Sequence, residues 1–507
     1  MTFIRRLQRK KAARRRWTVA LLTLSGIFLI CGVALISLSV WYRVTFNITF
    51  KELLYTLASP LKGTGRATVS RILLAVLPPT LTALVLYVVF AVLLIRRKKR
   101  YTVPRRIVAG ASACILLASG ILAVFCFRIP AYFKNLGAYT RVYDDYFVDP
   151  ASVAITAEGS TKNVILIYME SMETTYASVE AGGQQPVDNY MPRLTELAAK
   201  EVSFSDREDD LLGGLHTPTG TNWTMASLLA SSSGVNFMFP VEGNAMGQQD
   251  SFANQLITLG DILEQKGYTN EFICGSDATF GGRRTYLEQH GNYRITDFYA
   301  ARAEGYIPED YYVFWGYEDT VLYRIAKERL LALAEEDKPF NLTLLTIDTH
   351  HIDGYLCSEC GDEYEIGLAN VIACADRQVT EFVDWCRGQE FFEDTVIVIT
   401  GDHPRMDNTL VADVRYFDRT VYNCFINSAG EPADGADRGR TATVLDLFPT
   451  TLAAMGFRID GNRLVLGTNL FSGIRTLPER IGYNYLNNEL DKISQYFLDR
   501  FFPSDQP

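Results

Sequence analysis

The stretch DTVIVITGDH, residues Asp394–His403, carries the pattern on which the fold prediction rests. Val396 to Thr400 are all apolar or β-branched, which is typical of a strand buried on both faces of a parallel sheet. The strand ends at Gly401 and is followed by Asp402 and His403. Ligands of open α/β sheets bind beyond the carboxyl ends of the strands, and adjacent oxygen and nitrogen donors suit a metal site. On this stretch alone, half of a metal site and a strand-ending turn are equally good interpretations.

Charge divides the chain of 507 residues into two parts. Up to Lys134 there are 22 Lys and Arg residues against one acid, Glu52, whereas the remainder has 27 bases and 57 acids. A basic, apolar first quarter joined to an acidic remainder is typical of a membrane anchor followed by a water-soluble domain. The acidic balance of the larger part argues against nucleic acid as its partner.

Three apolar segments are long enough to span a bilayer, at about residues 17–41, 72–95 and 107–127. Dense basic clusters lie at residues 1–16 and 96–106, and such clusters mark the cytoplasmic side. We therefore expect a multi-pass protein of the cell membrane, with everything after about residue 130 on the extracytoplasmic face.

Six of the nine cysteines lie outside the predicted spans. Cys357 and Cys360 are separated by two residues, which suits a local disulfide in an oxidising exterior. A zinc knuckle would need a second ligand pair at matching spacing, and the sequence has none. A disulfide is the favoured interpretation, and the pairing of the other cysteines stays open.

Strand and helix patterns alternate through the acidic part, which predicts an α/β domain with a mostly parallel sheet covered by helices on both faces. The predicted organisation is a three-helix transmembrane anchor at 1–130, a connector at 131–160 and a catalytic domain at 161–507. The predicted strands are 164–169, 202–205, 268–274, 341–347, 396–400 and 421–427, and the main predicted helices are 191–201, 223–231, 256–266, 320–336, 369–387 and 441–456. The amphipathic segment Glu489–Phe502 is expected to pack on its own domain rather than on lipid.

Several predicted strands end in residues that can do chemistry. Only five histidines occur in the whole chain, and three of them lie at strand ends. Repeated polar strand ends with clustered histidines are hard to explain as a set of turns. The strand-end residues are Glu170, Asp277, His350, His351, Asp402 and His403.

The candidate nucleophile is less obvious. The Gly/Thr-rich loop that begins at Thr219 leads into the helix predicted from Trp223. A hydroxyl at a helix start lies beside unpaired backbone N–H groups, which would stabilise a phosphate or an attacking oxygen. A plain helix-capping threonine is the simpler interpretation of the loop by itself.

The motifs together resemble a known family. NVILIYMES, GTNWTMAS, the strand-end DTHH and ITGDH, in this order behind an N-terminal helix bundle, resemble the phosphoglycerol transferase and lipoteichoic acid synthase family of the alkaline phosphatase and sulfatase superfamily. The resemblance covers about residues 160 to 475 and includes LDLFPTTLAAMGF and LVLGTNLF. The forms GTNWT and GDHPRM are closer to the glucan phosphoglycerol transferases than to lipoteichoic acid synthases.

The resemblance implies a role for each matching residue. Glu170, Thr224, Asp402 and His403 match the metal ligands of the family, and Thr224 also matches its nucleophile. The metal is expected to be manganese, with magnesium or zinc as alternatives. His350 matches a histidine that contacts substrate, and the phosphate-gripping arginine falls at Arg283 or its neighbour Arg284, of which Arg283 is the prediction.

The implied reaction transfers glycerol phosphate from phosphatidylglycerol through a glycerophosphoryl-threonine. The acceptor would be an envelope glycan or a polyglycerolphosphate of the teichoic type. The sequence alone leaves the acceptor, the metal, the number of metal ions, the oligomeric state and any release of the outer domain open.

Three alternatives remain beside this reading. A sulfatase would need a Cys or Ser convertible to formylglycine, followed by Pro and Arg, whereas the chain has Thr224-Met225-Ala226-Ser227-Leu228. Phosphoethanolamine transferases share a threonine and a membrane anchor but usually have more spans and several disulfides. A non-catalytic sensor with the same fold would be expected to lack at least one of the four metal and nucleophile positions, and all four are present.

Overall fold

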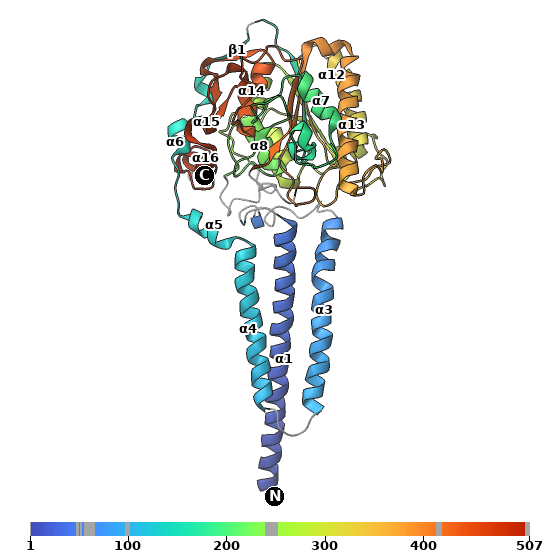
Figure 1. Ribbon diagram of the computed structural model, residues 1–507, viewed down its shortest axis with the longest axis vertical. Helices are drawn as coiled ribbons and strands as arrows, with labels where there is room; N and C mark the ends of the chain where they lie inside the picture. Colours follow the sequence, from blue (N-terminus) through green and yellow to red (C-terminus); the bar gives the residue numbers. More distant parts are fainter. Residues whose placement is uncertain are drawn as a thin grey trace. The chain divides into compact units, whose positions relative to one another are not determined.

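The computed structural model describes residues 2–46, 50, 53–54, 66–96, 102–157, 159–238, 252–411 and 418–501 (Figure 1). It divides into a helical unit, residues 1–50 and 66–133, and a second unit made of residues 51–65 and 134–507. The helical unit contains α1 (Thr2–Thr45), α3 (Arg66–Arg96) and α4 (Thr102–Cys126). Each contains a segment long and apolar enough to cross a membrane: Arg16–Thr45, Ser70–Arg96 and Arg106–Cys126.

Within the helical unit, α1 packs against both α3 and α4. The Tyr87 hydroxyl of α3 donates a hydrogen bond of 2.5 Å to the Leu22 carbonyl of α1. At the other end of the bundle, the rings of Tyr42 and Phe127 lie 4.7 Å apart. Many of the large apolar side chains on these helices are exposed, which is the surface that a bilayer would cover.

The second unit is built on a six-stranded sheet with the order β5-β4-β6-β2-β7-β9. The first five strands are parallel, and β9 runs antiparallel to β7 at the edge. Their bounds are β2 Asn163–Met169, β4 Thr269–Cys274, β5 Arg294–Thr296, β6 Phe340–Leu345, β7 Thr395–Gly401 and β9 Asn423–Ile426. The prediction of a mostly parallel sheet is confirmed.

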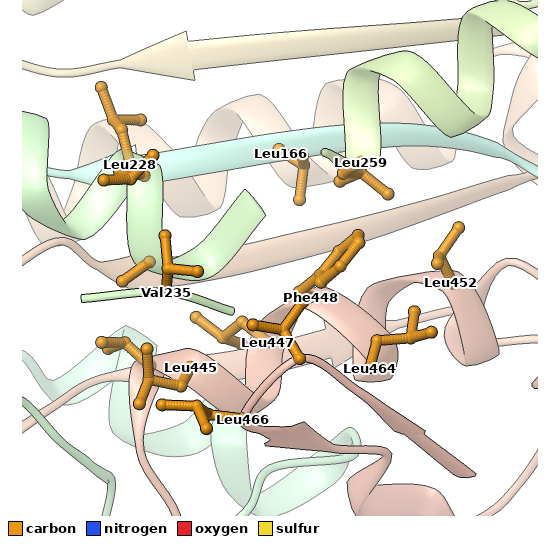
Figure 2. Close-up of a cluster of buried hydrophobic side chains, with 14 of the residues drawn as sticks. Leu166, Leu228, Val235, Leu259, Leu445, Leu447, Phe448, Leu452, Leu464 and Leu466 are labelled. Atoms are coloured by element: carbon orange, nitrogen blue, oxygen red, sulfur yellow. The ribbon is translucent and has the colours of Figure 1, made fainter. Parts of the chain in front are cut away.

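Successive residues of the central strand β2 enter two different hydrophobic clusters, because side chains alternate across a strand. Leu166 packs in the cluster that includes α8 (Thr224–Ser233), α9 (Leu259–Gln265) and α14 (Leu447–Ala454), as Figure 2 shows for Leu228 and Phe448. Ile165 and Ile167 pack in the cluster that includes α7 (Pro192–Lys200), α12 (Asp319–Glu335) and α13 (Gly367–Arg387). The sheet is therefore covered by helices on both faces, as the sequence predicts.

Short elements complete the chain, and among them α5 begins in the helical unit and ends in the second unit. Three two-stranded sheets pair β1 (Ile155–Ala157) with β10 (Phe457–Ile459), β3 (Leu215–His216) with β8 (Thr420–Val421), and β11 (Arg463–Leu464) with β12 (Gly467–Thr468). The remaining α-helices are α5 Ile129–Leu136, α6 Val142–Tyr146, α10 Arg283–Gln289, α11 Phe298–Ala303, α15 Leu477–Ile481, α16 Tyr483–Glu489 and α17 Gln495–Phe501.

Two details of the predicted sheet are wrong. Residues 202–205 do not form a strand, because only Val202 makes an isolated bridge, to Phe425. The strand predicted at 421–427 splits between β8 and β9, and β9 is antiparallel. Neither strand polarity nor pairing is encoded in the apolar pattern of a short segment, since both depend on partners far away in the sequence.

The amphipathic C-terminal segment packs on its own unit. Phe497 and Phe501 of α17 are buried, and the ring of Phe497 lies 5.2 Å from that of Tyr143 in α6. The position Phe502, at the end of the predicted segment, lies outside the described residues. The described part agrees with the expectation that these apolar side chains serve the core.

Candidate metal centre and nucleophile

Two neighbouring strands bring the first candidate ligands together. β2 and β7 are paired in parallel with Met169 opposite Gly401, so the residues that follow each strand lie side by side. The Asp402 backbone N–H donates to the Met169 carbonyl at 3.1 Å. Glu170 and Asp402 therefore meet at the carboxyl edge of the sheet.

The side chains of Glu170, Asp402 and His403 form one compact buried cluster. His403 Nε2 lies 3.5 Å from Glu170 Oε1 and 3.4 Å from Asp402 Oδ2. The other ring nitrogen, Nδ1, lies 2.9 Å from the Pro404 carbonyl, which fixes the orientation of the ring. All three side chains are at most 1% exposed.

Thr224 adds a hydroxyl to this cluster from a third element. It is the first residue of α8, where backbone N–H groups have no partner within the helix. Its hydroxyl donates a hydrogen bond to Glu170 Oε2 at 3.2 Å and lies 3.4 Å from His403 Nε2. The structure therefore brings together all four residues that the sequence predicts as metal ligands.

The electrostatics of the cluster are dominated by burial and by two adjacent carboxylates. Removal from water and the nearby Glu170 raise the pKa of Asp402 to about 7. Burial also opposes ionisation of Glu170, but the charges of His350 and His403 outweigh it and lower the pKa of Glu170. Burial disfavours a charged His403, yet the Asp402 and Glu170 carboxylates raise its pKa. The site is therefore deficient in positive charge.

These residues fit a divalent cation. Two carboxylates, an imidazole and a hydroxyl converge within bonding reach of one point, and such mixed oxygen and nitrogen sets suit manganese, magnesium or zinc. Asp402 Oδ2 is buried and accepts no hydrogen bond from the part of the chain that the structure describes. A buried acceptor without a donor is costly unless a ligand satisfies it. The cluster is thus a possible site for a divalent metal.

His350 lies beside this cluster, beyond the end of β6. Its charge influences the pKa of Glu170, and its Nδ1 lies 2.6 Å from the His351 carbonyl. Burial lowers the pKa of His350, and the nearby Glu170 carboxylate opposes this shift. The ring packs 4.6 Å from that of Trp315. These contacts leave His350 next to the candidate metal ligands without making it one of the compact group.

Arg283 is buried at the start of α10, directly after the loop that follows β4. Its guanidinium donates to the Ser276 hydroxyl at 3.0 Å and to the carbonyls of Phe280 and Asp277 at 3.1 and 2.9 Å. No hydrogen bond or ion pair to the metal-ligand cluster occurs among the described contacts of Arg283, so its substrate role stays a prediction. Asp277 lies in a local turn, where its carboxylate accepts hydrogen bonds from the backbone N–H and the hydroxyl of Thr279.

Supporting residues were not found by sequence reasoning. The Ser171 hydroxyl donates to Glu170 Oε1 at 2.9 Å, and its backbone N–H donates to Asp402 Oδ1 at 2.7 Å. Thr346, beyond β6, accepts the Glu170 backbone N–H at 2.9 Å. Asp319, at the start of α12, accepts the backbone N–H of Ile347 at 2.7 Å and thereby holds the end of β6. Only Ser171 had a sequence signal, as the residue directly after a strand-end acid.

Arg405 follows the Asp-His pair and is completely buried. Its Nε lies 2.8 Å from Asp407 Oδ2, and its Nη1 donates to the Thr349 carbonyl at 2.7 Å. Its backbone N–H donates to Glu173 at 3.0 Å, and Glu173 also pairs with Arg419 at 3.3 Å. Arg405 therefore braces the loop after β7 from the interior.

A parallel sheet whose carboxyl edge carries two acids, an imidazole and a helix-start hydroxyl defines an α/β protein with a candidate metal centre beside a candidate nucleophile. Residues 162–457 match the family model described as Sulfatase. This match extends over more than half of the chain, and the protein belongs to the sulfatase family.

A named relative is phosphoglycerol transferase I of Salmonella choleraesuis (strain SC-B67), which is 30% identical over 478 residues. The alignment covers 91% of this chain but 58% of the relative, so the chain spans little more than half the length of that protein. The same protein name recurs for Salmonella typhimurium at the same identity and coverage.

Two solved structures are similar to the chain at low sequence identity. One is the lipoteichoic acid synthase LtaP from Listeria monocytogenes, with a TM-score of 0.48, 17% identity, and coverage of 66% of this chain and 82% of that one. The other is the lipooligosaccharide phosphoethanolamine transferase A from Neisseria meningitidis, with a TM-score of 0.49, 16% identity, and coverage of 86% and 84%.

Proposed function

We propose that the protein is a metal-dependent phosphoglycerol transferase. It would move glycerol phosphate from phosphatidylglycerol, through a glycerophosphoryl-Thr224 intermediate, to a hydroxyl of an envelope glycan or of a teichoic-type polymer. The observation that carries the proposal is the position of the Thr224 hydroxyl, 3.2 Å from Glu170 Oε2 and 3.4 Å from His403 Nε2. The name of the curated relatives, phosphoglycerol transferase I, supports transfer of this group.

Thr224 is suited to act as a nucleophile because of its position. As the first residue of α8, it lies at the positive end of the helix dipole, and the free N–H groups of the first turn can bind phosphoryl oxygens. The side chain is half-buried, whereas the residues that follow it in α8 are buried except for Ser232, whose hydroxyl is bonded to the Leu228 carbonyl and to the Tyr286 hydroxyl. Its hydroxyl is therefore the chemically reactive group of α8 with access to a substrate.

The reaction divides into two balanced halves. In the first, the Thr224 oxygen forms a bond to phosphorus, the bond from phosphorus to the diacylglycerol oxygen breaks, and in net terms the threonine proton passes to that oxygen. In the second, an acceptor hydroxyl oxygen forms a bond to the same phosphorus, the bond from phosphorus to the Thr224 oxygen breaks, and the acceptor proton returns to that oxygen. Glu170 orients the threonine through the hydrogen bond to Oε2.

A bound divalent cation would lower the pKa of the threonine hydroxyl and stabilise negative charge on the phosphoryl oxygens. Glu170, Asp402, His403 and Thr224 would hold it, and manganese is the proposed ion. His350, beside the cluster, is the proposed substrate contact. Arg283 is the proposed phosphate contact, after a rearrangement of the loop that holds its guanidinium.

Apolar helices that anchor the protein in a membrane would hold its catalytic domain close to a lipid donor. We infer that residues 1–130 anchor the protein in the cell membrane and that residues 131–160 connect them to an extracytoplasmic catalytic domain at 161–507. The basic clusters at 1–16 and 96–106 support this orientation, because such clusters stay on the cytoplasmic side. An anchored domain would meet phosphatidylglycerol in the outer leaflet.

The test uses the full chain in mixed vesicles that contain radiolabelled lipid and manganese. Phosphatidylglycerol should yield diacylglycerol, whereas phosphatidylethanolamine and an aryl sulfate should remain intact. Faster release from phosphatidylethanolamine would favour the phosphoethanolamine alternative, and cleavage of the sulfate would favour a sulfatase.

The matched variants are Thr224→Ala and Thr195→Ala. Thr195 is a half-buried threonine on α7 whose hydroxyl bonds to the Met191 carbonyl. Loss of a nucleophile should reduce diacylglycerol release more than about 10³-fold, whereas Thr195→Ala should retain it. Equal activity of wild type and Thr224→Ala would refute the assigned nucleophile.

A further inference from the structure

A second cluster of potential metal ligands lies outside the site described above. The sulfur atoms of Cys357, Cys360 and Cys374 all lie within 4.8 Å of one another. Cys357 and Cys360 belong to the loop between β6 and α13, and Cys374 belongs to α13. Cys357 and Cys374 are buried, and Cys360 is half-buried.

The disulfide predicted between Cys357 and Cys360 is absent from the structure. Their sulfur atoms are 3.6 Å apart, whereas a disulfide bond is about 2.05 Å long. The Cys357 sulfur lies almost as close to Cys374, at 3.8 Å. The predicted pairing considered only the two cysteines that are close in the chain. In the folded protein, Cys374 of α13 brings a third sulfur beside them.

These separations match a shared metal ion. Tetrahedral zinc with Zn–S bonds of about 2.3 Å places neighbouring thiolate sulfurs about 3.8 Å apart. The observed values of 3.6 and 3.8 Å agree with this geometry. A disulfide would use two of the three sulfurs and leave the third in contact with it, whereas one cation can bind all three.

The surroundings of the sulfurs supply hydrogen-bond donors to thiolates. The Arg377 guanidinium lies 3.4 Å from the Cys374 sulfur. The Gln378 side-chain amide lies 3.7 Å from the Cys357 sulfur, and the Thr320 hydroxyl of α12 lies 3.9 Å from it. Donors of this kind fix the orientation of metal ligands and offset the negative charge of a thiolate set. Three different segments therefore converge on the cluster.

We propose that Cys357, Cys360 and Cys374 bind a soft divalent cation, zinc, at a site separate from the Glu170, Asp402 and His403 cluster. Three thiolates would leave one position of a tetrahedral zinc ion for a further ligand. The ion would join the loop after β6 to α13. Since this loop begins beside His350, the metal would stabilise the structure that carries a candidate substrate contact. The inference does not depend on the proposed transferase activity.

The first test uses the full chain, purified in detergent without chelators, reductants or oxidants. Alkylation of the denatured protein should modify all nine cysteines once zinc is removed. Two fewer modifications, with a peptide linked through Cys357 or Cys374, would identify a disulfide and overturn the proposal. The wild-type protein alone decides this outcome, so a variant that fails to fold cannot obscure it.

The second test replaces the native ion with Co²⁺. Coordination by thiolates should produce sulfur-to-cobalt charge-transfer absorption, which a site of oxygen and nitrogen ligands does not produce. The absorption should disappear in Cys374→Ser and in the less buried Cys360→Ser. It should persist in Cys386→Ser, the matched control, because Cys386 is a buried cysteine on the same helix, α13. Absence of the absorption in the wild type would refute the site.

Discussion

The two candidate metal clusters of this protein differ in donor chemistry and in how the fold assembles them. The Glu170, Asp402 and His403 cluster offers hard oxygen and nitrogen donors, and the cysteine cluster offers three soft sulfurs. The first comes from the ends of two neighbouring parallel strands, with Thr224 added by a helix start. The second comes from one loop and the helix that follows it.

Sheet topology and local chain geometry build sites with different donor atoms and different neighbouring groups. Strand pairing fixes the backbone at the ends of β2 and β7, and the start of α8 adds the half-buried Thr224 hydroxyl to the hard cluster. The cysteine cluster has donors from Arg377, Gln378 and Thr320 around its sulfurs and no comparable reactive hydroxyl in its ligand group. We therefore propose that the first cluster is catalytic and that the second stabilises the fold.

The largest expected separation between the clusters comes from His403→Ala. Removal of an inner ligand should weaken Mn²⁺ binding more than about 100-fold, since loss of supporting contacts alone costs 10- to 100-fold. Manganese binding is measured by electron paramagnetic resonance titration, with the thiolate–Co²⁺ absorption recorded in the same protein. The absorption should not change.

The control for that variant is His290→Ala, which removes another buried histidine, bonded to Asp261 and to the Phe252 carbonyl. It should retain Mn²⁺ binding. A loss of the thiolate–Co²⁺ absorption in folded His403→Ala would contradict the independence of the two clusters.

An intermediate effect is expected for Ser171→Ala. The hydroxyl of Ser171 donates to Glu170 Oε1 at 2.9 Å and orients this carboxylate for a metal. Its loss should weaken Mn²⁺ binding about 10- to 100-fold, as measured by the same titration. Ser428→Ala, which removes an exposed hydroxyl bonded to the Gly430 carbonyl, should have no effect. Unchanged Mn²⁺ binding in Ser171→Ala would contradict a role for this hydroxyl in orienting Glu170.

The smallest expected effect is that of Arg377→Gln on the cysteine cluster. The Arg377 guanidinium is half-exposed, so water screens its interaction with the Cys374 sulfur. Zinc affinity, measured by competition with a chromophoric chelator, should fall by less than about tenfold. Arg387→Gln on the same helix, which removes surface pairs with Glu201 and Asp384, should leave zinc affinity unchanged. A large loss in both variants would indicate general destabilisation of α13.

The sequence alone predicts the buried strand and the strand-end acids of the first cluster, but not the direction of β9. The run Val396 to Thr400 identifies a buried strand because every residue in it is apolar or β-branched, and neighbouring parallel strands necessarily bring Glu170 and Asp402 to one edge. The antiparallel direction of β9 could not be obtained in this way, since its pairing with β7 depends on the chain path between them.

Residues whose roles depend on packing were equally hidden. Nothing local in the sequence indicates that Arg405 is buried. In the structure it contacts Glu173, Asp407 and Arg419 in the interior. Cys374 lies inside a helix with an ordinary apolar pattern, and its place beside Cys357 depends on how the preceding loop folds back onto α13. Neither arrangement is local in sequence.

We propose that Thr224 carries the transferred group in a covalent intermediate. The most direct measurement is the intact mass of the full chain after incubation with manganese and phosphatidylglycerol in the absence of an acceptor. We predict a glycerophosphate adduct that peptide mapping assigns to Thr224 and that is absent from Thr224→Ala. Diacylglycerol release without any adduct, or an adduct of the same mass on Thr224→Ala, would contradict the account.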